Sequence, residues 1–332
     1  MKIFERKIAV STSTSISPDS SDSRTVFWLR FLTFPVLAIV LYPLFVMGYG
    51  GEHVVVRCVW VAGLTYCWFC VGGSFHEAVH DTLFRNSAAN RIVGTLIGTL
   101  IGIPFTVYRE THRRHHACLN TSADYELWPY SDPATSLTFR RVFVWLDLFF
   151  GVVTAPWIYS RIYFSGDSKL SPESRRTISV EYLEIAVFWT IAVSGLVLVL
   201  MDRGFDWTQF DPVWLLPLLL SPVANTTRKF VEHLGLTSED PLLGTRTVVG
   251  GNALSRFLRY LNFDIAVHGP HHRYPKARHF ELAPRLKNYQ QQHPDQQVPV
   301  FHSYTAAVMD VLPCLWKNPA TGSGSASKRT TS

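Results

Sequence analysis

Cysteine is scarce and irregularly spaced in this chain, which has five among 332 residues: Cys58, Cys67, Cys70, Cys118 and Cys314. An odd number without regular spacing argues against a disulfide scaffold. Cys67 and Cys70 form a CxxC motif, but the surrounding run is apolar and has no βαβ pattern. We therefore interpret this motif as helix packing and not as a redox site.

Charged residues are also few, at 17% of the chain, whereas soluble domains usually contain about 25%. The formal net charge is +6, but lysine and arginine are scattered beside apolar segments. This distribution argues against nucleic-acid binding, which would need a basic stripe. Hydrophobic residues make up 47% of the chain, and 22 Phe, 13 Tyr and 10 Trp suit a body embedded in a bilayer. The N-terminal region lacks a signal-peptide pattern, since no cleavable apolar run precedes the first long one.

Long apolar runs predict an all-α fold, an integral membrane helical bundle. Residues 26–48 and 54–75 each provide about 22 residues, enough to cross a bilayer, and predict a helical hairpin. Residues 182–201 and 213–227 predict a second hairpin. The fold expected is therefore about four transmembrane helices in two hairpins, plus interfacial helices.

Two weaker segments lie between the hairpins. Residues 92–107 carry Gly94, Gly98 and Gly102 at a four-residue period, which predicts one smooth helix face. At about 16 residues this segment fits a re-entrant or interfacial helix better than a span, although the sequence leaves spanning open. Residues 142–159 are rich in aromatic side chains and predict an interfacial helix.

Positive charge beside the apolar runs predicts the orientation. The N-terminus, residues 76–181 and everything after Thr227 are expected in the cytoplasm, where they would form a helical cap. Three regions follow from composition. A polar N-terminal tail at 1–25 precedes a membrane domain at 26–316, and a disordered C-terminal tail is expected at 317–332.

Histidine is the residue type whose pattern indicates chemistry. Nine of the 13 histidines form one HxxxH motif, two HxxHH motifs and one isolated position: His76, His80, His112, His115, His116, His268, His271, His272 and His233. On a helix, positions i, i+3 and i+4 share a face, so each motif would present its imidazoles together. Nine nitrogens exceed the three or four that one zinc needs, and suit two metal ions. Imidazole binds iron, zinc, copper and nickel alike, so ligand type does not choose the metal.

The three boxes and their surroundings resemble the membrane fatty-acid desaturase and hydroxylase superfamily, over roughly residues 30–315. The second box is followed by Asp124 and Glu126, the third box continues as HHRYP, and Glu232 precedes the isolated His233. The resemblance implies that the nine histidines bind two iron ions (Fe2+/Fe3+) and that dioxygen is a co-substrate. It also implies that an unactivated C–H bond of a lipid is attacked.

Other polar residues have more open roles. Asp124, Glu126 and Glu232 could accept hydrogen bonds that orient ligand imidazoles, or could be solvated or capping carboxylates. The four histidines outside the motifs predict surface or interfacial roles, with His279 the exception most open to another role: His53, His279, His293 and His302.

Two positions depart from the pattern of the superfamily. Pro270 lies between the histidines of the third box, and proline suits the first turn of a helix. We therefore expect a helix to begin near Pro270, with His268 just before it. Lys229 stands four residues before His233, where some members have asparagine, so no water-bridging amide is expected there.

The reaction and the substrate stay open. Desaturation of a fatty acyl chain of a lipid is the first prediction, and a hydroxylase or ketolase of a lipid or carotenoid is the alternative. A sphingolipid or a carotenoid could also replace the acyl lipid as substrate. The chain contains no GxGxxG and no CxxCH motif, so we expect a separate electron donor, a ferredoxin or small haem protein. Its docking face would be basic, although the same residues could instead face lipid phosphates: Arg113, Arg114, Arg273, Lys276 and Arg278.

Two other classes of protein compete with this interpretation. His76, Glu77 and His80 also match HExxH, the signature of zinc proteases with a glutamate base, which would leave both HxxHH motifs unexplained. A metal transporter or sensor would have looser histidine tracts and more polar groups inside its spans. Here Arg30 and Arg57 lie near segment ends.

Overall fold

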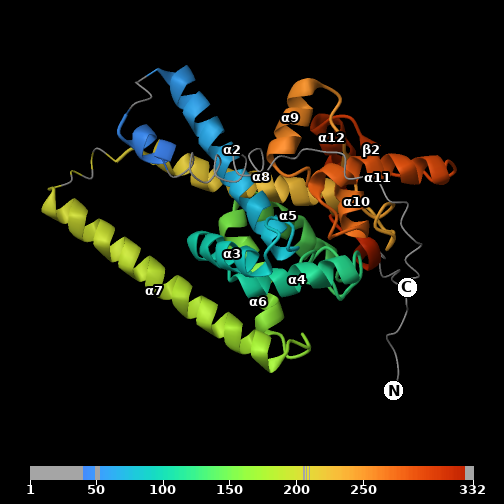
Figure 1. Ribbon diagram of the computed structural model, residues 1–332, viewed down its shortest axis with the longest axis horizontal. Coiled ribbons are helices and arrows are strands. Elements are labelled where there is room, and N and C mark those ends of the chain that lie inside the picture. The colour runs from blue at the N-terminus through green and yellow to red at the C-terminus, as the bar shows by residue number, and fades with distance from the viewer. Residues whose placement is uncertain (1–39, 49–52, 205, 207, 209, 326–332) are drawn as a thin grey trace.

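The computed structural model describes residues 40–48, 53–204, 206, 208 and 210–325, whose regular structure is almost entirely helical (Figure 1). Two short parallel strands, β1 (Thr247–Val248) and β2 (Val300–Phe301), are the described exception. The all-α class predicted from the sequence is confirmed. The helices are α2 (Val54–Val79), α3 (Ser87–Ile101), α4 (Phe105–Ala117), α5 (Leu137–Phe149), α6 (Gly151–Phe164), α7 (Pro172–Asp202), η2 (Pro212–Leu215), α8 (Leu216–His233), α9 (Ala253–Leu261), α10 (His268–Arg273), α11 (His279–Gln292), α12 (Tyr304–Lys317) and η3 (Gly322–Ser325).

Two described helices, α2 and α7, are long and apolar enough to cross a bilayer. The bent pairs α3–α4 and α5–α6 would raise the number to four if each pair counts as one span. The chain is thus an all-α membrane protein. Most of the predicted span 213–227 lies in α8, but this helix is not long and apolar enough to pass as a membrane span. The predicted span 26–48 lies outside the described residues except at 40–48.

The chain bends sharply within residues 92–107, where the glycine spacing predicts one smooth helix. Helix α3 ends because Gly102 adopts a left-handed conformation with φ of 75°, which favours glycine at a helix C-terminus. Pro104 is the N-cap of α4, and the two helices meet at 104°. The prediction of a single helix was therefore wrong: Gly102 is a cap and not part of a helix face.

The other two glycines of this segment allow the chain to fold back on itself. A Cβ atom on Gly94 would lie 2.3 Å from the ring of Phe105, and one on Gly98 would lie 2.4 Å from the Ile103 carbonyl oxygen. The glycine period thus reflects close approach across the bend.

Residues 142–159 also form two helices, where the sequence predicted one. Helices α5 and α6 meet at 118°, with the buried Asp147 one turn before the break. Its carboxylate accepts hydrogen bonds from the hydroxyl of Tyr130 at 2.9 Å and of Thr154 at 2.7 Å. The ammonium group of Lys229 on α8 lies 2.7 Å away. This network ties the bend to α8, which aromatic content alone could not reveal.

The helices pack around α2 and α8, which are in extensive contact with each other. One apolar core joins α2, α3 and α4 through Phe75 and Phe105, and another joins α5, α8 and α12 through Phe143 and Phe230. Helix α7 runs along one edge of the molecule, and α9 to α12 gather on the opposite side (Figure 1). The ends of α2, α4 and α8 therefore meet in the middle of the protein.

Residues 318–325 fall within the stretch that composition assigns to a disordered tail, but they are packed. The backbone N–H of Thr321 donates to the carbonyl of Tyr130 at 3.0 Å, and that of Ser323 donates to Asn120 at 3.0 Å. Thr321 is fully buried. The small residues that suggested disorder instead let this backbone lie close to the loop after the second box. The remaining predicted tail segments, 1–25 and 326–332, lie outside the described residues.

Candidate metal centre

The histidine boxes lie at helix ends that converge. His76 occupies the last turn of α2, and His80 caps it. The second box occupies the last turns of α4, and His233 is the last residue of α8. The third box forms most of α10. This short helix begins at His268 and not near Pro270 as predicted, since a proline in the first turn needs no N–H.

The nine histidines of the motifs form two groups, in each of which the candidate ligand atoms lie within 4.8 Å of one another. We call them the five-histidine group, which is largely buried, and the four-histidine group, which is buried throughout. The first contains His76, His80, His112, His116 and His271, and the second contains His115, His233, His268 and His272.

The spacing of the ring nitrogens fits a metal ion in each group. The Nε2 atoms of His80 and His112 lie 3.0 Å apart. In the four-histidine group, the Nε2 atom of His268 lies 2.8 Å from that of His233 and 3.0 Å from that of His272. Two imidazoles that bind one metal at about 2.1 Å and about 90° to each other would place their nitrogens about 3 Å apart. The residues present therefore fit two ions.

Two carboxylates in the loop after α4 contact ligand candidates from behind. Asp124 lies 2.7 Å from Nδ1 of His115, and Glu126 lies 2.8 Å from Nδ1 of His112. A carboxylate at Nδ1 favours the tautomer whose Nε2 carries a free lone pair for a metal. Burial raises the pKa of a carboxyl group, but the imidazoles of His112 and His115 outweigh burial and hold the pKa of Glu126 below its usual range.

Glu232 has a corresponding position beside the four-histidine group. Its carboxylate lies 3.5 Å from Nδ1 of His268 and accepts a hydrogen bond from Arg228 at 2.7 Å. Each of the three carboxylates singled out in the sequence thus lies against a different histidine. Their orienting role stays a prediction.

The protonation state of the third box suits metal binding. Burial, together with the neighbouring imidazoles, holds the pKa values of His271 and His272 well below the usual histidine value. Both rings are therefore neutral near pH 7, which is the form that binds a metal.

Glu77 turns away from the ring nitrogens that would face a metal. Its carboxylate accepts a hydrogen bond from Thr82 at 2.6 Å and lies 3.3 Å from Nδ1 of His76. The Nε2 atom of His76 is buried and has no hydrogen-bond partner among the described residues. Glu77 therefore lies behind His76, where it could orient this ring, and not where the water-activating base of a protease would be needed.

The four remaining histidines lie outside both groups. His53, His293 and His302 are exposed. His279 is buried and places Nδ1 2.9 Å from the carboxylate of Asp264.

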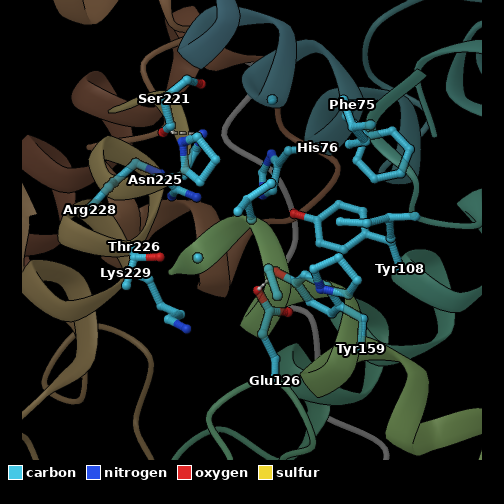
Figure 2. Close-up of a pocket in the computed structure, with 18 of the residues that line it drawn as sticks. Phe75, His76, Tyr108, Glu126, Tyr159, Ser221, Asn225, Thr226, Arg228 and Lys229 are labelled. Carbon is cyan, nitrogen blue, oxygen red and sulfur yellow. Dashed lines mark hydrogen bonds between the residues drawn. The ribbon is translucent and has the colours of Figure 1, made fainter. Parts of the chain in front are cut away.

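A cavity of about 570 Å³ opens beside the two histidine groups. Residues of α2, α3, α4, α6, α7 and α8 line it, and His76, His112 and His233 are among them. Figure 2 shows Phe75, Tyr108 and Tyr159 on one side and polar side chains of α8 on the other. The cavity can thus hold an apolar molecule against the imidazoles.

The sequence interpretation missed the two tyrosines of this cavity. The ring of Tyr108 stacks on that of His112, with centroids 5.4 Å apart, and meets the ring of Tyr159 at 4.9 Å. The Tyr159 hydroxyl donates to Glu126 at 3.3 Å. Tyr108 lies four residues before His112, so helical spacing could have identified it. No comparable signal marks Tyr159.

Comparisons with known proteins agree with this geometry. The sequence profile of the fatty acid desaturase family matches residues 52–304, which include all nine histidines. The omega-6 fatty acid desaturase of Spinacia oleracea chloroplasts is 25% identical over 237 residues, covering 67% of this chain and 50% of the relative. The chloroplast enzymes of the same name from Arabidopsis thaliana and Brassica napus are each 22% identical over 241 residues, covering 69% of this chain and 50% of theirs. The chain spans about half the length of these curated relatives, and it belongs to the fatty acid desaturase family.

Proposed function

We propose that this protein is an oxygen-dependent desaturase that introduces a double bond into a fatty acyl chain of a membrane lipid. The observation that carries the proposal is the pair of adjacent histidine groups at one end of a cavity with largely apolar walls. Family membership and the chloroplast omega-6 relatives support the same reaction class.

The two groups would hold two iron ions, one each, through Nε2 of the nine histidines. Iron bound there would supply the activation of dioxygen. The buried imidazoles of His271 and His272, whose pKa values are held low, would bind a metal without first losing a proton. The carboxylates of Asp124, Glu126 and Glu232 would fix the ring orientations and stabilise the Nδ1 protons.

The cavity would position the substrate and exclude water. Trp68, Phe75 and Leu218 provide apolar surface, and His76 and His112 line the same space. An acyl chain held there would expose one methylene pair to the metals. Desaturation removes two hydrogen atoms from that pair, and reducing one dioxygen to two waters then requires two further electrons and two protons.

Those electrons would come from a separate donor, a ferredoxin or small haem protein. Arg113, Arg273, Lys276 and Arg278 are exposed on or near the helices that carry the second and third boxes. Arg114 is less available, because its guanidinium donates to the carbonyl of Ser168 at 2.7 Å. We propose that the exposed four form the docking face and that this face is cytoplasmic.

The test is expression in a host of defined lipid content, followed by mass spectrometry of its fatty acids. We expect a new double bond with the wild type and none with His115→Ala. His293→Ala, an exposed histidine outside both groups, is the control and should retain the product. Full product from His115→Ala would disprove the ligand assignment. A new hydroxyl or keto group in place of a double bond would show that the protein is a hydroxylase or ketolase and not a desaturase.

A further inference from the structure

One wall of the cavity is a stripe of α8 whose side chains become more polar towards the histidines. Leu218, Ser221, Asn225 and Arg228 follow one another at intervals of three or four residues, and so lie on one helix face. Figure 2 shows the polar members of this stripe along one side of the cavity. A wall that only contacted hydrocarbon would not need these groups.

Arg228 has donors to spare on this wall. Its Nη1 atom donates to Glu232 at 2.7 Å, and its side chain is only 15% exposed. A guanidinium carries five N–H groups. Within the part of the chain that the structure describes, the side chain of Arg228 forms no other hydrogen bond. Arg228 is one of the residues that line the cavity.

Further donors surround the same space. Asn225 donates once, to the carbonyl of Ser221 at 3.3 Å, and so retains a second amide N–H. The hydroxyl of Tyr108 lines the opposite side and has no hydrogen-bond partner among the described residues. Lys229, by contrast, is paired with Asp147 at 2.7 Å.

A purely apolar occupant would leave these donors buried without acceptors, which is costly. An oxygen atom of the substrate would satisfy them. Arg228 precedes His233 by five residues of α8, or about 7.5 Å along the helix axis. An oxygen bound by Arg228 would therefore lie close to the metals, with few carbon atoms between it and the reacting carbon.

We propose that Arg228, assisted by Asn225, binds an oxygen atom of the lipid substrate, an ester carbonyl or a hydroxyl. The preferred substrate thus carries this oxygen near the carbon that reacts. The reaction at this carbon rests on the proposed function. The preference of the cavity for a ligand that carries an oxygen atom does not depend on it. Arg228 is a residue that determines specificity, and its pairing with Glu232 aims it at the cavity.

Binding to the full chain in detergent micelles tests this inference without turnover. The probes are a long-chain alcohol, the methyl ester of the matching acid and the alkane of equal length. Trp68 and Trp189 line the cavity, so their fluorescence reports occupancy. The variants are Arg228→Met and Asn225→Leu, with Arg285→Met on α11 as the matched control. Arg285 pairs with Glu281 away from the cavity.

The wild type and Arg285→Met should bind the oxygenated probes about tenfold more tightly than the alkane, as one hydrogen bond to a charged group provides. Arg228→Met should lose most of this preference and bind the alkane as before, and Asn225→Leu should lose part of it. The inference is overturned if the wild type shows no preference or if Arg228→Met retains it. If Arg228→Met loses its metal or unfolds, Asn225→Leu decides, and an unchanged preference there overturns the inference. A preference without any product from acyl lipids would refute the proposed function alone.

Discussion

The imidazole rings of His116 and His272 are stacked, with centroids 4.1 Å apart and planes inclined by 15°. His116 belongs to the five-histidine group and His272 to the four-histidine group. The two candidate metal sites are therefore in direct contact through their ligands. They form one centre, and a change in one group can reach the other.

This contact predicts different effects for two histidine substitutions. His80→Ala and His272→Ala should each lower the metal content by about one ion, because each removes a ligand from one group. His272→Ala should also weaken the remaining site, because His116 loses its stacking partner. The ring contacts of His80 with described residues, by contrast, all lie within its own group. Metal content during titration with a chelator measures both effects, and equal retention by the two variants would contradict the coupling.

Asp124→Asn should loosen the four-histidine group. The amide would place an N–H against Nδ1 of His115, where the carboxylate now lies at 2.7 Å, and so would favour the wrong tautomer. A loss of about 10-fold to 100-fold in metal affinity is expected. Chelator competition measures it, with the exposed Glu239→Gln as the control. Wild-type affinity in Asp124→Asn would mean that this carboxylate does not orient the ligand.

Lys229→Met should destabilise the protein, because it leaves the buried Asp147 without its cation. The expected loss is about 3–5 kcal/mol. The double variant Asp147→Asn/Lys229→Met should recover much of it, since the unpaired charge is then absent. Thermal unfolding in detergent micelles compares the three proteins, and a double variant as unstable as the single one would refute this explanation.

Gly98→Ala should strain the bend between α3 and α4. The new Cβ atom would lie 2.4 Å from the Ile103 carbonyl oxygen, which is backbone and cannot move aside cheaply. A loss of about 1–3 kcal/mol in unfolding free energy is expected. Gly63→Ala on α2 is the matched control, because nothing lies within 4 Å of its Cβ position. A similar loss in both variants would show that helix composition, and not the bend, is responsible.

The sequence predicted the local features of the centre well. The spacing within each motif, and the place of the first two boxes and of His233 after apolar runs, are properties of neighbouring residues. The division into two groups could not be predicted, because it cuts across the motifs. His112 and His116 share a face one turn apart and join one group, whereas His115 points to the other.

The bends and the polar cavity wall depend on contacts between distant segments. Gly102 fits a helix face or a C-cap equally well by spacing, and only the return of the chain onto α3 decides. The pair of Lys229 and Asp147 joins residues 82 positions apart. In the sequence, Lys229 appeared only as a departure from a family pattern, and its partner carried no signal.

The most direct test of two irons held by nine histidines is the metal content of the gently purified full chain, measured by elemental analysis alongside a His115→Ala/His271→Ala variant that removes a ligand from each group. We expect about two iron ions per wild-type chain and almost none in the variant. One zinc and no iron per wild-type chain, or iron undiminished in the variant, would contradict the account.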